Sequence, residues 1–416
     1  MLTEWNAAVR SDGPPDATKI SGTKRIGILT LHSGMNEGAI LQAYALSTGL
    51  RAANPGWTVE IVDQRYPSHL AVYGPLDNDR KRALAGFIDE RLPLSRERFV
   101  EDRHDRAFDF IRRTYDGLIV GSDELWKVDY RRRFLGLRVE QTNPWSPAFP
   151  NAYWPDESIR VPKIAYAASV GGTDWRTIPP RDKRRMAGIL RDFSLLGVRD
   201  DRTRSFLSWL GSGLGERAEW VPDPSFLLDL KAVVQPASLR SKLERFGVDF
   251  LRPRLAVALT DSAWLKRIIE RFRTKGFQII GLSDSNGFSD VELFREGFTS
   301  LEWLGIFGQV DACLSQRMHA CIACILNGTP FAALDFYGNR MDEESKLKDL
   351  MRAFNLLDFH FYYSEKEASF DRLAAVCERV MDGSWPTDAV SDTRRRFQAR
   401  AGEFVKKVET VVSRGS

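Results

Sequence analysis

Short apolar runs alternate along the chain with longer stretches in which apolar residues recur at helical spacing. Each run ends in polar or glycine-bearing sequence, which is typical of a buried strand in a parallel sheet. Because helical stretches separate the strands, parallel pairing with right-handed crossovers is expected, and the pattern predicts an α/β fold. The predicted strands are Arg25–Leu31, Thr58–Val62, Leu118–Val120, Lys163–Ala168, Leu195–Val198, Arg254–Thr260, Gln278–Leu282, Ala312–Ser315 and Pro330–Leu334.

The stretches between these runs predict the helices. Helical spacing runs from about residue 40 to residue 51, directly after the first strand. Residues 76–113 also show a mainly helical pattern, broken at Pro93. Further helices are predicted at 236–246, 263–275, 300–308, 318–327 and 388–414, and the last of these is rich in charge.

Two series of strands and helices predict two lobes. A chain of 416 residues is too long for one ordinary core, and two lobes of about 150–200 residues each are expected. Two facing Rossmann-like lobes with a cleft between them would place a ligand at the carboxyl ends of the strands. The predicted parts are a flexible leader over 1–23, an N-terminal lobe over 24–228, an interlobe segment over 229–250, a C-terminal lobe over 251–385 and a C-terminal helix over 386–416.

The composition is that of a folded protein without membrane-spanning helices. Apolar residues make up 43% and charged residues 28%, and no apolar run reaches the roughly 20 residues that a bilayer requires. The amino terminus lacks the apolar core segment of a secretory signal, so no such signal is expected there. Of four cysteines, Cys313, Cys321 and Cys324 are close together, which is no disulfide framework and favours a reducing cytoplasm. Because Cys321 and Cys324 lie in an apolar run, core packing is favoured over metal or redox chemistry.

The net charge is only +4, but arginines gather between residues 80 and 138, including the run Arg131–Arg133. Acidic residues are interleaved with part of this stretch, which favours a solvated helix face with ion pairs one turn apart. A basic surface facing an anionic partner, either a phosphate-bearing acceptor or a membrane, is the alternative. Nucleic acid has little support, since no recognised binding motif accompanies the charge.

The strongest candidate site is the segment Ser315-Gln-Arg-Met-His319, where a predicted strand ends and an apolar helix begins. Free N–H groups and the helix dipole attract anions at such a place. The guanidinium of Arg317 suits a carboxylate or a phosphate, and His319 can exchange a proton near neutral pH. Taken alone, the segment also fits a surface arginine followed by a helix-capping histidine.

Three other segments follow predicted strands and offer weaker candidates. Asn36 and Gly38 stand at a helix start, where a glycine lets a ligand approach closely. Ser122 and Asp123 follow Gly121 and can cap a helix or reach a ligand. Arg199 could face a ligand or pair with a neighbouring acid. Dinucleotide, P-loop, zinc-protease and nucleophile-elbow motifs are all absent from the sequence, as is a metal-spaced cluster.

The order of these segments resembles that of the polysaccharide pyruvyl transferase family. Two segments depart from the family pattern in part. In the first, Glu124 stands where a glutamine is usual and Lys127 where an asparagine is common, and in the second, Val170 follows Ser169 where an aromatic residue is frequent. The resemblance spans roughly residues 25–355. The segments that carry it are NEGAILQAYAL (36–46), YDGLIVGSDELW (115–126), KIAYAASV (163–170), VRD (198–200), VPDP (221–224), SLEWL (300–304), SQRMH (315–319) and GTP (328–330).

The resemblance implies a fold of two Rossmann-like lobes similar to the GT-B glycosyltransferases, with phosphoenolpyruvate as donor substrate and no metal or other cofactor. It places Arg317 and His319 on the positions that bind the donor and act in catalysis, and Arg199 on a further donor-site arginine. The donor would bind the C-terminal lobe and the acceptor the N-terminal lobe. The remaining substrate-binding candidates are Ser315, Asn36, Gly38, Ser122 and Asp123.

The implied activity is transfer of pyruvate from phosphoenolpyruvate onto a pair of sugar hydroxyls. The acceptor would be a sugar or glycan, free or lipid-linked, and peripheral contact with the inner face of a membrane is left open. Trp145, Tyr153 and Trp154 could stack on a sugar ring or pack within a long loop. A glycosyltransferase that uses a nucleotide sugar and a non-catalytic sugar-binding protein remain the alternatives.

Overall fold

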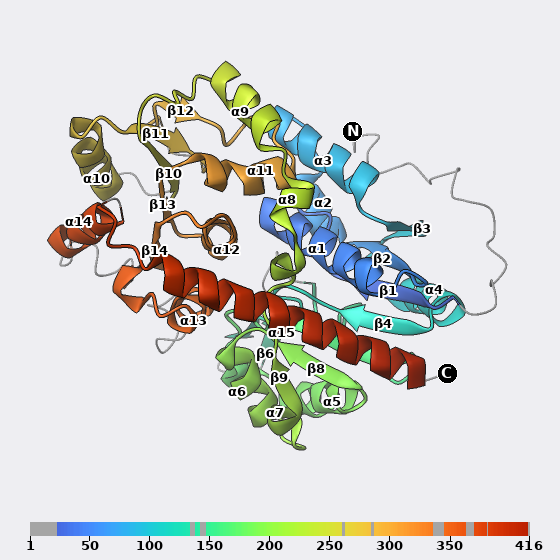
Figure 1. Ribbon diagram of the computed structural model, residues 1–416. Coiled ribbons are helices and arrows are strands. Elements are labelled where there is room, and N and C mark those ends of the chain that lie inside the picture. The colour runs from blue at the N-terminus through green and yellow to red at the C-terminus, as the bar shows by residue number, and fades with distance from the viewer. Residues whose placement is uncertain are drawn as a thin grey trace. The chain divides into compact units, whose positions relative to one another are not determined.

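The computed structural model describes residues 23–133, 138–141, 147–259, 263–283, 287–335, 345–362, 370–380 and 382–414. The chain divides into two compact units (Figure 1). The first comprises Met1–Asp77, Ala85–Leu227 and Gln398–Ser416, and the second comprises Asn78–Leu84 and Leu228–Phe397. Each unit is built on its own parallel sheet.

The first unit contains a seven-stranded sheet in the order β3-β2-β1-β4-β7-β8-β9, and every neighbouring pair is parallel. An antiparallel hairpin, β5 (Tyr130–Arg133) and β6 (Arg138–Gln141), stands apart from this sheet. The strands are β1 (Arg25–Leu29), β2 (Thr58–Arg65), β3 (Leu94–Val100), β4 (Gly117–Val120), β7 (Lys163–Ala168), β8 (Leu195–Val198) and β9 (Ala218–Trp220). The helices are α1 (Glu37–Ala53), α2 (Pro67–Tyr73), α3 (Asp79–Arg91), α4 (Asp105–Thr114), η2 (Trp175–Thr177), α5 (Pro180–Arg191), α6 (Asp201–Leu210), α7 (Leu214–Arg217) and η3 (Pro224–Leu227). The start of α3, up to Leu84, belongs to the second unit.

The second unit contains a six-stranded sheet in the order β12-β11-β10-β13-β14-β15, again parallel throughout. Its strands are β10 (Arg254–Ala258), β11 (Gln278–Gly281), β12 (Val291–Glu292), β13 (Ala312–Ser315), β14 (Phe331–Asp335) and β15 (His360–Tyr362). Its helices are α8 (Leu230–Val233), α9 (Pro236–Arg245), α10 (Ala263–Thr274), α11 (Ser300–Ile306), η4 (Phe307–Gln309), α12 (Met318–Asn327), α13 (Lys346–Ala353), η6 (Leu357–Phe359) and α14 (Phe370–Arg379).

The last helix, α15 (Thr387–Arg414), contributes to both units. In the second unit, the Phe397 ring packs on Phe354 with 4.6 Å between ring centroids. In the first unit, Phe404 packs edge-on against Tyr166 of β7 at 5.3 Å. The same phenylalanine explains Gly197 in β8, because a Cβ atom there would lie 2.6 Å from the Phe404 ring. The helix therefore completes the covering of the first sheet.

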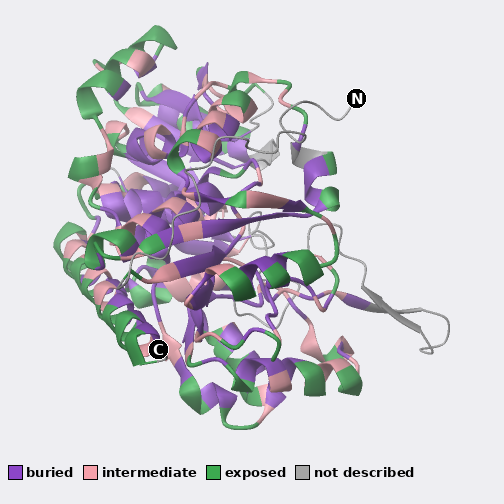
Figure 2. Cartoon of the chain, turned by 90° about the vertical axis from the view of Figure 1, so that its right-hand side faces the viewer, coloured by how far each residue is buried: buried purple, intermediate pink, exposed green. Residues whose placement is uncertain are grey.

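Buried strands and exposed outer helix faces are visible in Figure 2. All residues of β4 and β7 are buried, as expected for parallel strands with helices on both faces. Among the helices of the described residues, none is long and apolar enough to cross a membrane.

Each of the nine predicted strands is present, with ends that differ by at most three residues. The prediction of a mainly helical 76–113 was wrong in part, because β3 occupies Leu94–Val100 between α3 and α4. This strand lies at the edge of the sheet and carries two arginines and a glutamate, so it lacks the apolar run of a central strand. The short strands β9, β12 and β15 and the hairpin were missed as well.

Candidate functional site

The segment Ser315–His319 forms a tight turn between β13 and α12 in the second unit. The buried Ser315 hydroxyl accepts a hydrogen bond from the Arg317 backbone N–H (2.9 Å) and donates one to the Arg317 carbonyl (3.1 Å). Arg317 itself is extended, with φ −104° and ψ 124°, and α12 begins at the next residue. One serine side chain thus fixes the backbone of the turn and leaves the arginine side chain out of it.

The Arg317 side chain is half-buried, and within the described residues no carboxylate lies within ion-pair distance of it. Its guanidinium carbon lies 6.0 Å from the centroid of the Phe294 ring. Helix α12 has no side-chain cap and no acidic residue in its first turn, so nothing there competes for its positive end. His319 is half-buried in that first turn. The turn therefore combines the features that bind anions.

The body of α12 is anchored in the core. Its residues from Ala320 to Leu326 are all buried, and Gly328 ends the helix in the left-handed conformation at φ 77°. Burial raises the pKa of the Cys321 and Cys324 thiols well above its usual value, so both remain protonated. The prediction that these cysteines are core residues is confirmed.

Arg199, which follows β8 in the first unit, lies in a different environment. Its Nη1 donates to Asp223 (3.1 Å) and to the amide oxygen of Gln42 (3.2 Å), and its Nη2 donates to Asp123 (3.2 Å). The side chains of Arg199 and Asp223 are each only 4% exposed. Burial would lower the pKa of the guanidinium, but the two carboxylates outweigh burial and raise it above its usual value. Arg199 is therefore held in a buried ion-pair network.

The partner Asp123 belongs to a loop with strained backbone. Asp123 has φ 99°, and Ala167 on the neighbouring β7 has φ 52°. The Ser122 hydroxyl donates to the Ala167 carbonyl (3.2 Å), and the Ser169 N–H donates to the Asp123 carbonyl (2.9 Å). Gln42 donates a further hydrogen bond to the Asp123 carboxylate (3.0 Å). Non-glycine residues at positive φ concentrate at functional sites and persist only where neighbours fix them, as these do.

Asn36 and Gly38 also belong to the first unit, where Asn36 caps α1. The Asn36 side-chain oxygen accepts hydrogen bonds from the N–H groups of Gly38 (3.1 Å) and Ala39 (3.3 Å). Gly38 is buried within the first turn. Both residues are thus accounted for by the helix start. The substrate-binding candidates of the sequence accordingly fall into two groups, one at the strand ends of each unit.

Comparison with known proteins decides the family. The sequence model of the polysaccharide pyruvyl transferases matches residues 36–336, which is most of the chain. The chain belongs to the polysaccharide pyruvyl transferase family. Both strand-end segments described above, the Ser122–Asp123 loop and the Ser315–His319 turn, lie within the matched region. Among curated proteins, no sequence match to this chain was found.

Solved structures show which fold this family member has. UDP-GlcNAc 2-epimerase from Methanocaldococcus jannaschii is similar with a TM-score of 0.54 at 11% identity, over 93% of this chain and 99% of that one. The corresponding enzyme from Neisseria meningitidis, solved with UDP-GlcNAc bound, gives 0.55 at 8% identity, over 94% and 100%. A glycosyltransferase from Rickettsia africae gives 0.50 at 12%, over 95% and 99%. The predicted α/β fold with two Rossmann-like lobes of the GT-B type is confirmed.

Sequence reasoning missed a buried charge cluster around Asp63 of β2. Its carboxylate accepts hydrogen bonds from Arg65 Nε (2.6 Å) and Arg98 Nε (2.8 Å), and His32 Nε2 lies 3.0 Å away. Burial would raise the pKa of Asp63, but the hydrogen bond and charge of His32 and the charge of Arg65 hold it well below its usual range. The sequence held no signal for this cluster, since these residues come from three separate segments.

A second missed cluster lies at the carboxyl edge of the second sheet. The buried Asp335, which ends β14, accepts a hydrogen bond from the Ser345 hydroxyl, and His360 Nε2 lies 3.1 Å from the same carboxylate oxygen. Serine and histidine thus both contact the acid. That is not the order of a nucleophilic triad, in which the histidine would stand between the other two.

Tyr153 and Trp154, two of the three aromatic candidates for sugar stacking, do not form an exposed platform. Tyr153 and Trp154 are buried, at 2% and 1% exposure, and pack on Tyr66 and Trp126. Of the two interpretations of these residues, packing is correct and sugar stacking is wrong. Trp145 lies outside the described residues.

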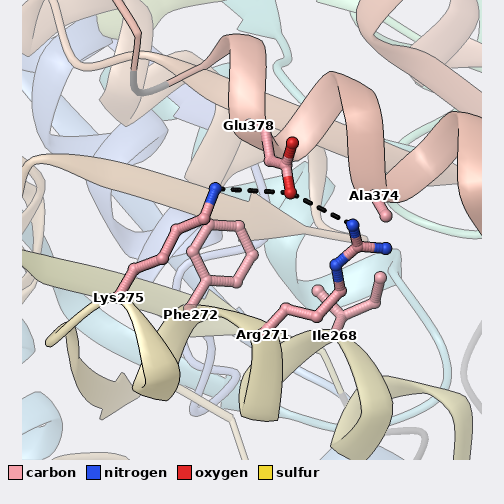
Figure 3. Close-up of a pocket in the computed structure, with 6 residues that line it drawn as sticks. All are labelled: Ile268, Arg271, Phe272, Lys275, Ala374 and Glu378. Atoms are coloured by element: carbon pink, nitrogen blue, oxygen red, sulfur yellow. Dashed lines mark hydrogen bonds and ion pairs between the residues drawn. The ribbon is translucent and has the colours of Figure 1, made fainter.

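A shallow surface depression lies between α10 and α14 of the second unit. Figure 3 shows Arg271 of α10 and Lys275, directly after that helix, reaching toward Glu378 of α14. Their nitrogen atoms lie 3.2 and 3.3 Å from the Glu378 carboxylate. The carboxylate therefore already pairs with both cations. None of the predicted site residues lines this depression, and no function is assigned to it.

Proposed function

We propose that this family member transfers the pyruvyl group of phosphoenolpyruvate onto a pair of sugar hydroxyls as a ketal and releases inorganic phosphate. The observation that carries the proposal is the Ser315–His319 turn, with an arginine outside any ion pair of the described residues at the start of an uncapped helix. The family match supports the same activity. The scheme uses no metal and no cofactor besides the donor substrate.

Donor binding is assigned to Arg317 and to the start of α12. Phosphoenolpyruvate carries a carboxylate and a phosphate, and a guanidinium can bind either group through two parallel hydrogen bonds. The backbone N–H groups of the first helical turn and the helix dipole add attraction for the other group. Ser315 supports this arrangement, because its hydroxyl holds the backbone of Arg317 from both sides.

His319 is assigned as the general acid. The reaction begins when a proton is added to the methylene carbon of the donor, which makes C2 electrophilic. One sugar hydroxyl adds to C2, the bond between C2 and the phosphate oxygen breaks, and the second hydroxyl then closes the ketal. Of the two hydroxyl protons, one replaces the proton given to the methylene carbon and the other leaves with phosphate. The anionic groups of the donor would bind next to His319, which stands in the first turn of α12.

Arg199 takes a different role in the proposal. A guanidinium that already pairs with two carboxylates and an amide has little capacity left for a donor anion. We assign it to holding the Ser122–Asp123 loop in its strained conformation. That loop and the first unit are the proposed acceptor side, where a sugar or glycan, free or lipid-linked, would bind.

Phosphate release tests the proposal. The full chain is incubated with phosphoenolpyruvate, with a panel of sugar acceptors, and with both together. Phosphate is expected only in the last case, and His319→Gln should lower kcat by roughly 10²–10⁴-fold while donor binding persists. Phosphate that appears without an acceptor, or an unchanged rate in His319→Gln, contradicts the mechanism.

Thermal stability measured with added ligand distinguishes the proposed transfer from the alternative, a glycosyltransferase that uses a nucleotide sugar. A ligand that binds the folded state raises apparent stability by about 2.7 kcal/mol at a hundredfold excess over its Kd. Phosphoenolpyruvate should raise Tm for the native chain, whereas UDP-GlcNAc should not. Stabilisation by the nucleotide sugar alone would overturn the proposal in favour of a glycosyltransferase.

A further inference from the structure

Helix α5 of the first unit exposes almost nothing but arginine. Apart from Pro180, its exposed positions are Arg181, Arg184, Arg185 and Arg191. Across the described part of the chain, none of these four guanidinium groups has an ion-pair partner. Within the described residues, ion pairs therefore leave these four positive charges on α5 unneutralised.

Three other exposed arginines of the molecule have ion-pair partners. Arg82 pairs with Asp79 at 2.6 Å, Arg103 pairs with Asp105 at 2.7 Å, and Arg240 pairs with Glu244 at 3.2 Å. These pairs fit the solvated, self-neutralising surface that interleaved charges predict. Exposed arginines without an ion pair among the described residues also occur singly, as at Arg51, Arg160 and Arg204. What distinguishes α5 is that four of them lie on one helix.

The acidic residues near α5 are mostly engaged. Asp182, the one acidic residue of α5, accepts a hydrogen bond from the Tyr130 hydroxyl at 2.8 Å. Asp174, just before η2, pairs with Arg176 at 2.9 Å. Asp201 at the start of α6 is exposed. Because Tyr130 begins β5, the same hydrogen bond also fastens the arginine-containing hairpin to α5.

Two half-buried tryptophans lie beside these cations. Lys183 Nζ of α5 is 4.1 Å from the centroid of the Trp209 ring, and the Arg202 guanidinium is 4.8 Å from that of Trp175. Both tryptophans pack against the buried Phe206 of α6, at 5.8 and 6.1 Å. Partly exposed indole rings flanked by lysine and arginine are typical of surfaces that lie at the boundary between lipid headgroups and water.

We propose that this α5 face, made of Arg181, Lys183, Arg184, Arg185, Trp175 and Trp209, docks on an anionic lipid bilayer. Phosphate groups of lipid headgroups supply the counter-charge that the protein lacks here, and the tryptophans suit the headgroup depth. A DNA duplex would use the same arginines, but its bases are stacked on one another and offer no free face to the half-buried indole rings. The inference is independent of the proposed transfer reaction, which needs no membrane.

Vesicle sedimentation tests the docking face with the full chain. The native protein should sediment with vesicles of phosphatidylglycerol and phosphatidylcholine in equal parts, but not with phosphatidylcholine alone. Each arginine near an anionic surface strengthens binding to the vesicle. The triple variant Arg181→Gln, Arg184→Gln and Arg185→Gln should therefore lower partitioning onto anionic vesicles on the order of a hundredfold. Raising the salt concentration should weaken binding of the native chain in the same direction.

The matched control removes three positive charges at exposed positions that already have partners: Arg82→Gln, Arg103→Gln and Arg240→Gln. It should partition as the native chain does, and both triple variants should keep the native Tm and the native phosphate release with a soluble acceptor. If both triple variants lose vesicle binding equally, the binding depends on net charge alone, and the proposal is overturned. No sedimentation with anionic vesicles, or tighter binding to a DNA duplex at equal salt, would overturn it too.

Discussion

Two arginines stand just beyond strand ends, Arg199 after β8 in the first unit and Arg317 after β13 in the second. Their environments are opposite. Arg199 is 4% exposed and contacts the carboxylates of Asp123 and Asp223. Arg317 is half-buried and, among the described residues, has a phenylalanine ring and no acid beside it. Topological position and residue type alone therefore do not define a ligand-binding arginine. Its partners do.

The difference extends to the backbone that each arginine adjoins. In the first unit, buried charge holds a loop in which Asp123 and the neighbouring Ala167 adopt positive φ. In the second unit, one serine hydroxyl fixes the turn, so the arginine fork is left for a ligand. The two sites thus illustrate a structural and a chemical use of the same side chain. Four experiments test that distinction.

The largest effect is expected for Arg199→Ala. The substitution leaves two buried carboxylates without their cation, and breaking a buried pair in this way costs about 3–5 kcal/mol. Denaturant unfolding should show the loss, and the triple variant Arg199→Met, Asp123→Asn, Asp223→Asn should recover part of it. If Arg199→Ala keeps native stability and only loses donor affinity, the residue is a ligand arginine and the distinction fails.

Arg317→Ala should leave the free energy of unfolding within about 0.5 kcal/mol of native, because the side chain is partly exposed and has no ion-pair partner among the described residues. Phosphate release should fall by roughly 10²–10³-fold, which is the effect of removing one charge-stabilising group. The rise in Tm with phosphoenolpyruvate should disappear as well. Arg317→Lys is the control, since it keeps the charge but not the fork, and it should recover only part of the rate.

Acid should destabilise the first unit through Asp63. The pKa of Asp63 in the folded chain lies well below its usual value of 3.8, so the stabilisation is complete above about pH 4 and is lost as the pH falls below it. The expected loss is about 2–3 kcal/mol, the size for one paired aspartate. Asp63→Asn should be less stable at neutral pH and should show a flatter decline in acid. If Asp63→Asn loses as much stability in acid as the native chain does, other groups are responsible for the acid sensitivity.

The smallest effect is expected for Asn36→Ala. Loss of the cap of α1 should cost about 1 kcal/mol, and Asn36→Asp, which can also cap, should cost less. Neither variant should change the KM for donor or acceptor. A raised acceptor KM in Asn36→Ala, with stability unchanged, would return this residue to the substrate-binding group.

Much of the fold was predictable because central parallel strands are apolar throughout, as in β4 and β7. The edge strand β3 was not, because arginines and a glutamate interrupt its pattern. The Ser315–His319 turn could be predicted since all of its parts are adjacent in sequence. The pairing of Arg199 could not, because its partners Asp123 and Asp223 lie 76 and 24 residues away. The environments of the two arginines differ because of partners that are distant in sequence. A local sequence motif does not contain such partners.

Helix α15 imposes an order on synthesis. The residues that cover Tyr166 and Gly197 of the first sheet come from its final turns, including Phe404, so the unit that the ribosome begins first is also the last to be completed. During translation, the sheet around β7 and β8 must wait for α15 with an apolar face uncovered. Truncation before Phe404 would therefore uncover strands that are encoded far upstream of the missing residues.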